Sequence, residues 1–114
     1  MDVQPREIRN YLTSDGKSPF EDWFNRLRDT RAKAKIRTRF DRILKGNLGN
    51  YRSVGQGVFE FRIDDGPGYR IYFGQVELAI VVLLCGGDKS TQEQDIVKAK
   101  KYWADYERRT STRQ

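Results

Sequence analysis

Two runs of alternating residues between Val58 and Phe73 constrain the fold more than any other part of this chain. Apolar and polar residues alternate from Phe59 to Asp64 and again from Tyr69 to Phe73, which is the period of strands with one buried face. The four residues between the two runs supply the turn, and they are Asp65, Gly66, Pro67 and Gly68. The pattern predicts an antiparallel hairpin that turns one aromatic face to the core.

An uninterrupted apolar run follows the hairpin. It extends from Leu78 to Cys85, which predicts a strand covered on both faces and therefore central in the sheet. Gly86 and Gly87 are expected to end this strand. Cys85 is the single cysteine, so no internal disulfide is possible, and its thiol is expected to be a buried small hydrophobe.

Helical patterns flank these strands. Ser18, Pro19 and Glu21 form a capping box with proline at the first helical position, which predicts a helix over about residues 19–28. A second apolar stripe predicts a helix from about Thr30 to Lys45, with Gly46 after it as the C-terminal cap.

A third helix is expected after the apolar strand. Its start is predicted near Ser90, because Ser90 with Glu93, or Thr91 with Gln94, can form another capping box. One face of this helix is apolar and consists of Ile96, Ala99, Trp103 and Tyr106. The tail after Arg108 is expected to fray.

Two weaker strand signals complete the order of elements. Val3 to Leu12 contains Pro5 and is expected to be an edge strand, and the glycine-rich stretch from Gly46 to Gly57 is expected to be a loop with a short strand near Tyr51 to Val54. With 114 residues, the chain is expected to form one domain over residues 1–114. The order of helices and strands predicts the α+β fold class.

The charge of the chain favours an acidic partner. The net charge is +6, and the segment from Arg26 to Lys45 holds nine basic and two acidic residues, a local excess of seven. A basic surface attracts phosphates at long range, so nucleic acid leads over an acidic protein as the expected partner. Arg37, Arg39 and Arg42 are candidate RNA-binding residues, and the alternative is an ordinary solvated helix face.

Several classes of site and location are not expected. The chain has no histidine and one cysteine, so we expect no metal site and no cofactor, and a nucleophile with a histidine base is excluded. No run approaches the roughly 18 apolar residues that cross a bilayer, and the start has no secretory signal pattern. A cytoplasmic location without a membrane partner is therefore expected.

Four polar residues are expected to share the outer face of the hairpin: Glu60, Arg62, Arg70 and Tyr72. Two arginines this close repel unless an anion or a carboxylate lies between them, and either Glu60 or a phosphate can take that place. Lys89 and the following helix start are expected beside this face, where backbone amides near Thr91 and Gln92 can bind an anion. The alternative is a salt-bridged solvent face with an ordinary capped helix.

Three segments, FEFRID, GPGYRIYF and LLCGGDKSTQEQDI, resemble the RelE/ParE superfamily of bacterial toxins, and most closely its HigB-like branch, the addiction module killer proteins. The resemblance implies a RelE-like fold, in which two N-terminal helices pack on a small, mostly antiparallel sheet with a C-terminal helix. It also implies the toxin of a type II toxin–antitoxin system, held inactive by a cognate antitoxin. RelE-type members are ribosome-dependent endoribonucleases that cut mRNA without a metal.

The resemblance also implies roles for particular residues. Arg70 matches the hairpin arginine that stabilises charge on the scissile phosphate, Lys89 matches a basic position after the apolar strand, and Arg62 lies among the basic residues of the preceding strand. Glu60 is a candidate general base for the ribose 2′-OH, although an arginine is the alternative partner. Tyr72 either stacks on a base or is structural.

One position departs from the family pattern. Several ribonuclease members carry a tyrosine or histidine near the start of the last helix, where this chain has Gln92 and Asp95. This departure leaves the general acid and base unassigned. Two rival functions therefore stay open beside the nuclease: a ParE-like inhibitor of DNA gyrase, and a degenerate, non-toxic module that binds antitoxin or RNA.

The expected partners follow from the toxin interpretation. They are the ribosome, mRNA and an antitoxin, which is expected to be a helix-turn-helix protein encoded by the adjacent gene.

Overall fold

The strands of this protein form one five-stranded sheet in the order β1-β5-β4-β3-β2. The computed structural model describes residues 4–111. Along the chain the elements are β1 (Glu7–Asn10), α1 (Pro19–Arg26), α2 (Thr30–Leu44), β2 (Arg52–Gly55), β3 (Val58–Ile63), β4 (Tyr69–Val76), β5 (Ile80–Gly87), a 3-10 turn (Lys89–Thr91) and α3 (Gln92–Ser111). The fold is therefore mixed α+β, as predicted.

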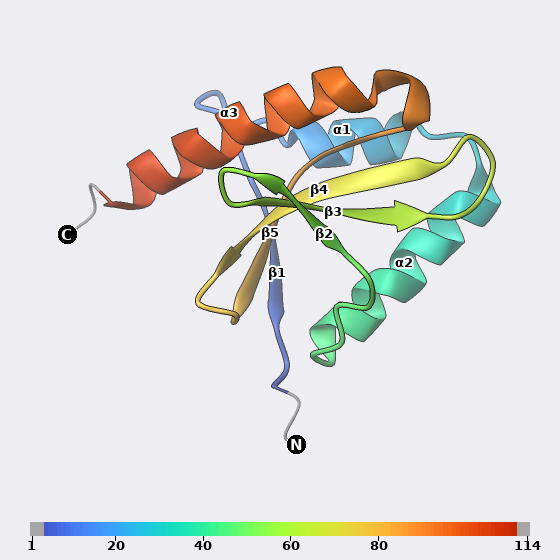
Figure 1. Cartoon of the computed structure of the whole chain (residues 1–114), viewed down its shortest axis with the longest axis horizontal. Helices are drawn as coiled ribbons and strands as arrows, with labels where there is room; N and C mark the ends of the chain where they lie inside the picture. Colours follow the sequence, from blue (N-terminus) through green and yellow to red (C-terminus); the bar gives the residue numbers. More distant parts are fainter. Residues whose placement is uncertain (1–3, 112–114) are drawn as a thin grey trace.

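The helices cover the two faces of the sheet separately (Figure 1). Helices α1 and α2 pack on one face, in a core that contains Phe20, Ile36, Phe61, Ile71 and Phe73. Helix α3 packs on the other face, in a second core that contains Tyr72, Val82, Leu84, Ala99 and Trp103. β1 is parallel to β5, and the other strand neighbours are antiparallel.

The two N-terminal helices agree with the sequence pattern. The hydroxyl of Ser18 accepts a hydrogen bond from the amide of Glu21 at 3.1 Å, so Ser18 is the N-cap of α1, although α1 ends at Arg26. Helix α2 begins at Thr30 after the N-cap Asp29 and ends at Leu44. Gly46 has a positive φ of 97° and closes this helix, as predicted.

Each predicted strand is present in the structure, but several begin or end at other residues than predicted. β1 lies at a sheet edge as expected, but it covers only Glu7–Asn10, and Val3 lies outside the described residues. β2 starts one residue later than predicted, at Arg52, and β4 continues beyond Phe73 to Val76. The predicted central strand, β5, is an interior strand between β1 and β4, while the middle strand of the five is β4.

The start of β5 was predicted wrongly. Glu77 and Leu78 form a tight turn in which both residues have positive φ, 52° and 60°, and the amide of Ala79 donates to the carbonyl of Val76 at 2.9 Å. Leu78 is 67% exposed in this turn, and the strand begins at Ile80. Turns of this geometry usually carry Asn-Gly, so this turn has no recognisable sequence signal. The other end agrees with the prediction, because β5 continues past Cys85 into the glycine pair and ends at Gly87.

The last helix is longer than expected. Helix α3 continues through Arg108 to Ser111, and residues 112–114 lie outside the description. The 3-10 turn that precedes it is capped by Asp88, whose carboxylate accepts from the amide of Ser90 at 2.8 Å, in place of either predicted capping box. No helix of residues 4–111 is both long enough and apolar enough to cross a membrane.

Candidate nucleic-acid interface

A buried carboxylate organises the outer face of the hairpin. Glu60 on β3 is 1% exposed. One carboxylate oxygen, Oε1, accepts a hydrogen bond from Arg52 Nε at 2.8 Å. The other oxygen, Oε2, accepts from Gln92 Nε2 at 3.0 Å and lies 3.8 Å from Arg70 Nε. This one side chain therefore joins β2, β3, β4 and α3.

The register of the hairpin brings the predicted residues together. Glu60 is opposite Tyr72, and Arg62 is directly opposite Arg70, so all four side chains share one face as expected. Only part of this face is exposed to solvent. Glu60, Arg70 and Tyr72 are buried because α3 packs over them, while Arg62 is exposed at the end of β3.

The electrostatics of this cluster follow from its burial and its hydrogen bonds. Burial alone would raise the pKa of Glu60, but the hydrogen bonds from Arg52 and Gln92 outweigh it and hold the pKa below the ordinary value. Burial, followed by the charge of Glu60, raises the pKa of the Tyr72 hydroxyl, so this tyrosine is neutral at physiological pH. The contacts of Glu60 are those of a carboxylate that holds arginines.

Arg70 is buried, although the sequence placed it on the outer face of the hairpin. Its residue exposure is 5%, and its Nη1 donates to the carbonyl of Gly68 at 2.9 Å. Its Nε is buried without a hydrogen bond to any described residue. Arg70 thus lies under the Gly66–Gly68 turn, beside Arg62 and against Glu60.

Arg62 and Lys89 lie together on the surface. Both line a shallow hollow with Asp64, Asp65 and the Gly66–Gly68 turn, so Lys89 lies beside the hairpin as predicted. Within residues 4–111 neither cation forms an ion pair. Two unpaired cations on one hollow form a surface that an anion can reach.

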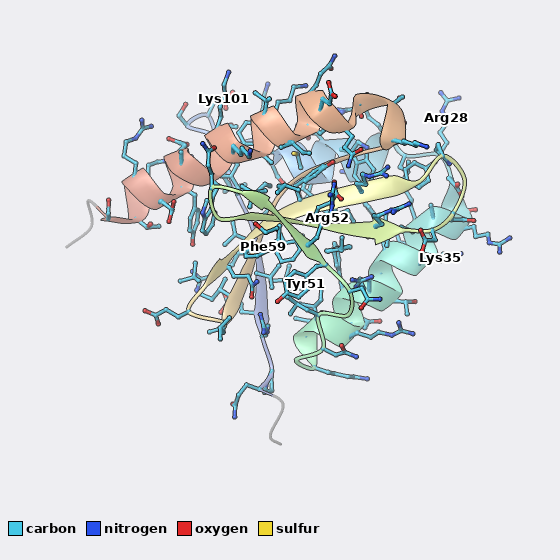
Figure 2. All side chains as sticks on the ribbon, in the orientation of Figure 1. Arg28, Lys35, Tyr51, Arg52, Phe59 and Lys101 are labelled. Atoms are coloured by element: carbon cyan, nitrogen blue, oxygen red, sulfur yellow. The ribbon has the colours of Figure 1, made fainter. Side chains whose placement is uncertain are left out.

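A second hollow, of about 480 Å³, lies on the other side of Arg62, between α2 and β2. Its charged lining residues are Arg39, Arg42, Arg52, Arg62, Glu60 and Asp64. Arg52 was not predicted, and it lies on β2 opposite Glu60 of the antiparallel neighbour β3 (Figure 2). The only available signal was its place in a short strand with no clear alternation, which does not separate it from an ordinary surface arginine.

The three candidate arginines of α2 differ in their surroundings. Arg37 lies over the ring of Phe24 at 5.3 Å. Arg39 lies over the ring of Phe61 at 4.6 Å and donates to the carbonyl of Leu48 at 3.0 Å, so it fastens the loop after α2. Arg42 alone of the three is exposed in the hollow without such a contact, within the described part of the chain.

The start of α3 uses its polar groups internally. Asp88 accepts from both the amide and the hydroxyl of Ser90, and these hydrogen bonds hold its pKa below the ordinary value. Asp95 accepts from the Thr91 hydroxyl at 2.6 Å, and burial raises the Asp95 pKa. The amides of Ser90 and Thr91 thus donate to the protein's own Asp88 carboxylate, which takes the place of an anion at Thr91. The Gln92 side chain is engaged with Glu60.

The arrangement can bind phosphates by charge. Arg62 and Lys89 line one hollow, Arg70 lies buried opposite Arg62 on the neighbouring strand, and a guanidinium forms strong, charge-assisted hydrogen bonds with phosphate oxygens. Within residues 4–111, no three or more histidine, cysteine, aspartate or glutamate side chains cluster as metal ligands do. Cys85 is buried, and burial raises the pKa of its thiol to about 12, which keeps it protonated.

A protein of Haemophilus influenzae resembles this chain closely. It carries the name uncharacterized protein and is 52% identical over 81 residues, which is 71% of this chain and 82% of that protein. No model of a known protein family matches the chain.

Proposed function

This chain belongs to the same protein family as the uncharacterized Haemophilus influenzae protein, and we propose that it is the toxin of a type II toxin–antitoxin system. In this proposal it has a RelE-like fold of the HigB-like branch and works in the cytoplasm as a ribosome-dependent mRNA endoribonuclease. Its partners are the ribosome, mRNA and a cognate antitoxin. The observation that supports this proposal is that Arg62 and Lys89, neither of which forms an ion pair within the described residues, line one hollow beside the Arg70–Glu60 pair.

The proposed reaction is attack of a ribose 2′-oxygen on the adjacent phosphorus. The new bond joins phosphorus to the 2′-oxygen and the bond to the 5′-oxygen breaks, which leaves a 2′,3′-cyclic phosphate and a 5′-hydroxyl. The 2′-hydroxyl loses a proton and the leaving oxygen gains one. Arg62 and Arg70 are suited to stabilise the charge that develops on the phosphate oxygens, and Lys89 is suited to contact the phosphate or assist the leaving group.

A primer-extension experiment on mRNA from bacterial cells that express the chain tests this proposal. We expect cuts inside translated codons, and we expect them to disappear in an Arg62→Ala, Lys89→Ala double variant. Both side chains are exposed, so the double variant should fold. Lys101→Ala is the matched control, because Lys101 projects from α3 away from the sheet (Figure 2).

Two outcomes would reject the nuclease. Intact mRNA together with an induced DNA-damage response would instead favour a gyrase inhibitor. Equal growth of cells that express the wild type or the double variant without an antitoxin would indicate a non-toxic binding module.

A further inference from the structure

We propose that the hollow between α2 and β2 is a second phosphate subsite, in which Arg42, Arg52 and Arg62 hold the RNA strand beside the place of cleavage. The identity of the ligand as RNA rests on the proposed function. The affinity for a polyanion rests on the hollow itself, whose charged lining has more arginines than carboxylates.

The arginines of this hollow are available to a ligand. Arg42 and Arg62 have no ion-pair partner within the described residues. Arg52 uses its Nε for the hydrogen bond to Glu60, and its side chain is 60% exposed. The two terminal nitrogens of Arg52 therefore remain as donors toward the hollow.

Glu60 fixes the spacing between this subsite and the predicted catalytic arginine. It holds Arg52 on one carboxylate oxygen and Arg70 on the other, so the two guanidinium groups lie on opposite sides of a single carboxylate. The negative charge between them offsets their mutual repulsion. Of the two guanidinium groups, that of Arg52 lines the hollow, whereas that of Arg70 is buried.

Arg62 connects this hollow to the one that contains Lys89, because Arg62 lines both. The two hollows therefore meet at Arg62, with Lys89 in one and Arg42 and Arg52 in the other. A phosphodiester backbone carries one negative charge at each phosphate, so successive phosphates of a strand can contact cations in both hollows. We therefore take an extended single strand as the polyanion that binds here.

An acidic peptide fits the hollow less well. Tight peptide binding needs buried aromatic or apolar anchors, and Tyr51 is the one large apolar side chain that lines the hollow. The ring of Tyr51 already packs against Phe59 at 5.5 Å and Phe73 at 5.7 Å. The hollow therefore offers charge without an apolar pocket, which suits phosphates.

Fluorescence anisotropy with a labelled 2′-O-methyl RNA oligonucleotide tests the subsite, because the blocked 2′-oxygen prevents cleavage. We expect Arg42→Ala and Arg52→Ala each to weaken binding roughly three- to tenfold. Each variant should also reduce the slope of log affinity against log salt by about 0.7, the value for one phosphate contact on a single strand. Lys101→Ala should change neither quantity, and circular dichroism checks the folding of all variants.

Three results would overturn the subsite: no binding by the wild type, unchanged affinity and slope in both variants, or displacement of the RNA by oligoglutamate at equal concentration. The last result would assign the hollow to an acidic protein. The binding experiment and the cleavage experiment can fail independently. Weakened RNA binding in both variants without mRNA cleavage in cells would keep the subsite and reject the nuclease, whereas cleavage in cells with unchanged binding would do the reverse.

Discussion

At the residue scale, Glu60 is a buried charge that links four elements of the fold. It is buried on β3 and holds Arg52, Arg70 and Gln92, which come from three other elements. A buried carboxylate with cationic partners contributes little net free energy as an intact group, but removal of its charge leaves the partners uncompensated. A substitution that removes the charge of Glu60 should therefore cost more stability than the intact group contributes.

We expect Glu60→Gln to lower the free energy of unfolding by about 2–4 kcal/mol, because the nearly enclosed Arg70 then loses its counter-charge. Gln92→Ala is the matched comparison, since it removes a single neutral donor to the same carboxylate and should cost about 1 kcal/mol. Urea unfolding followed by circular dichroism measures both. Equal losses in the two variants would contradict the assigned role of the charge.

The stabilisation that the Glu60 charge provides should depend on pH. The pKa of Glu60 is lower in the folded protein than its ordinary value of 4.5. Its charge therefore stabilises the fold fully above about pH 4.5 and loses this effect as the pH falls through the lower, folded-state value. The stability difference between the wild type and Glu60→Gln should be constant from pH 7 to pH 5 and should shrink below that range.

The sequence alone predicted which hairpin residues share a face, but it did not predict that three of them are buried. Alternation with a period of two placed Glu60, Arg62, Arg70 and Tyr72 on one face, because a shift by one residue would have buried both arginines among aromatic rings. Burial of three of these residues depends on α3, which packs from the far end of the chain. No local pattern encodes that contact.

At the scale of elements, two glycines allow a helix to approach each face of the sheet. A Cβ atom on Gly74 of β4 would lie 2.3 Å from the ring of Trp103 on α3. A Cβ atom on Gly86 of β5 would lie 2.4 Å from the ring of Trp23 on α1. Each tryptophan therefore packs directly on backbone, and the missing side chain sets the distance between helix and strand.

Gly74→Ala should destabilise the protein by about 1–3 kcal/mol, because the added methyl group displaces the large ring of Trp103 from a packed core. The effect should be smaller in a Trp103→Phe background, where the ring is smaller. A double-mutant cycle in urea measures this coupling. Additive losses would mean that the glycine is needed for another reason.

The start of α3 gives a second prediction at this scale. Asp88→Ala should lower stability by about 0.5–2 kcal/mol, since the carboxylate of Asp88 caps the amide of Ser90. Ser90→Ala should have a smaller effect, although the sequence had suggested Ser90 as a cap, because its hydroxyl serves only the Asp88 carboxylate. Thermal unfolding of both variants decides between the two caps. A larger loss in Ser90→Ala would restore the sequence-based assignment.

Elements with strong local signals were predicted well. Ser18 and Gly46 mark the ends of the helical pair correctly because capping depends on neighbouring residues alone. The start of β5 was missed because Glu77 and Leu78 take positive φ values that their side chains do not favour. The surrounding hairpin imposes that turn.

On the scale of the whole molecule, the sheet separates two hydrophobic cores, one on each of its faces. Helices α1 and α2 close one core and α3 closes the other. The end of the first strand segment also contacts α3, because the Tyr11 hydroxyl donates to Asp105 at 2.6 Å and the Tyr11 ring stacks on Tyr102 at 5.1 Å. Residues close to both ends of the described chain therefore meet on the α3 side of the sheet.

This arrangement predicts that the two faces unfold together, and the two tryptophans can report on them separately. Trp103→Phe leaves Trp23 on the α1 side, and Trp23→Phe leaves Trp103 on the α3 side. In each variant the urea midpoint from fluorescence should equal the midpoint from circular dichroism, as expected for a two-state domain of this size. If Trp103 reported a lower midpoint than circular dichroism, α3 would detach first. The cluster around Glu60 would then open to solvent before the sheet unfolds.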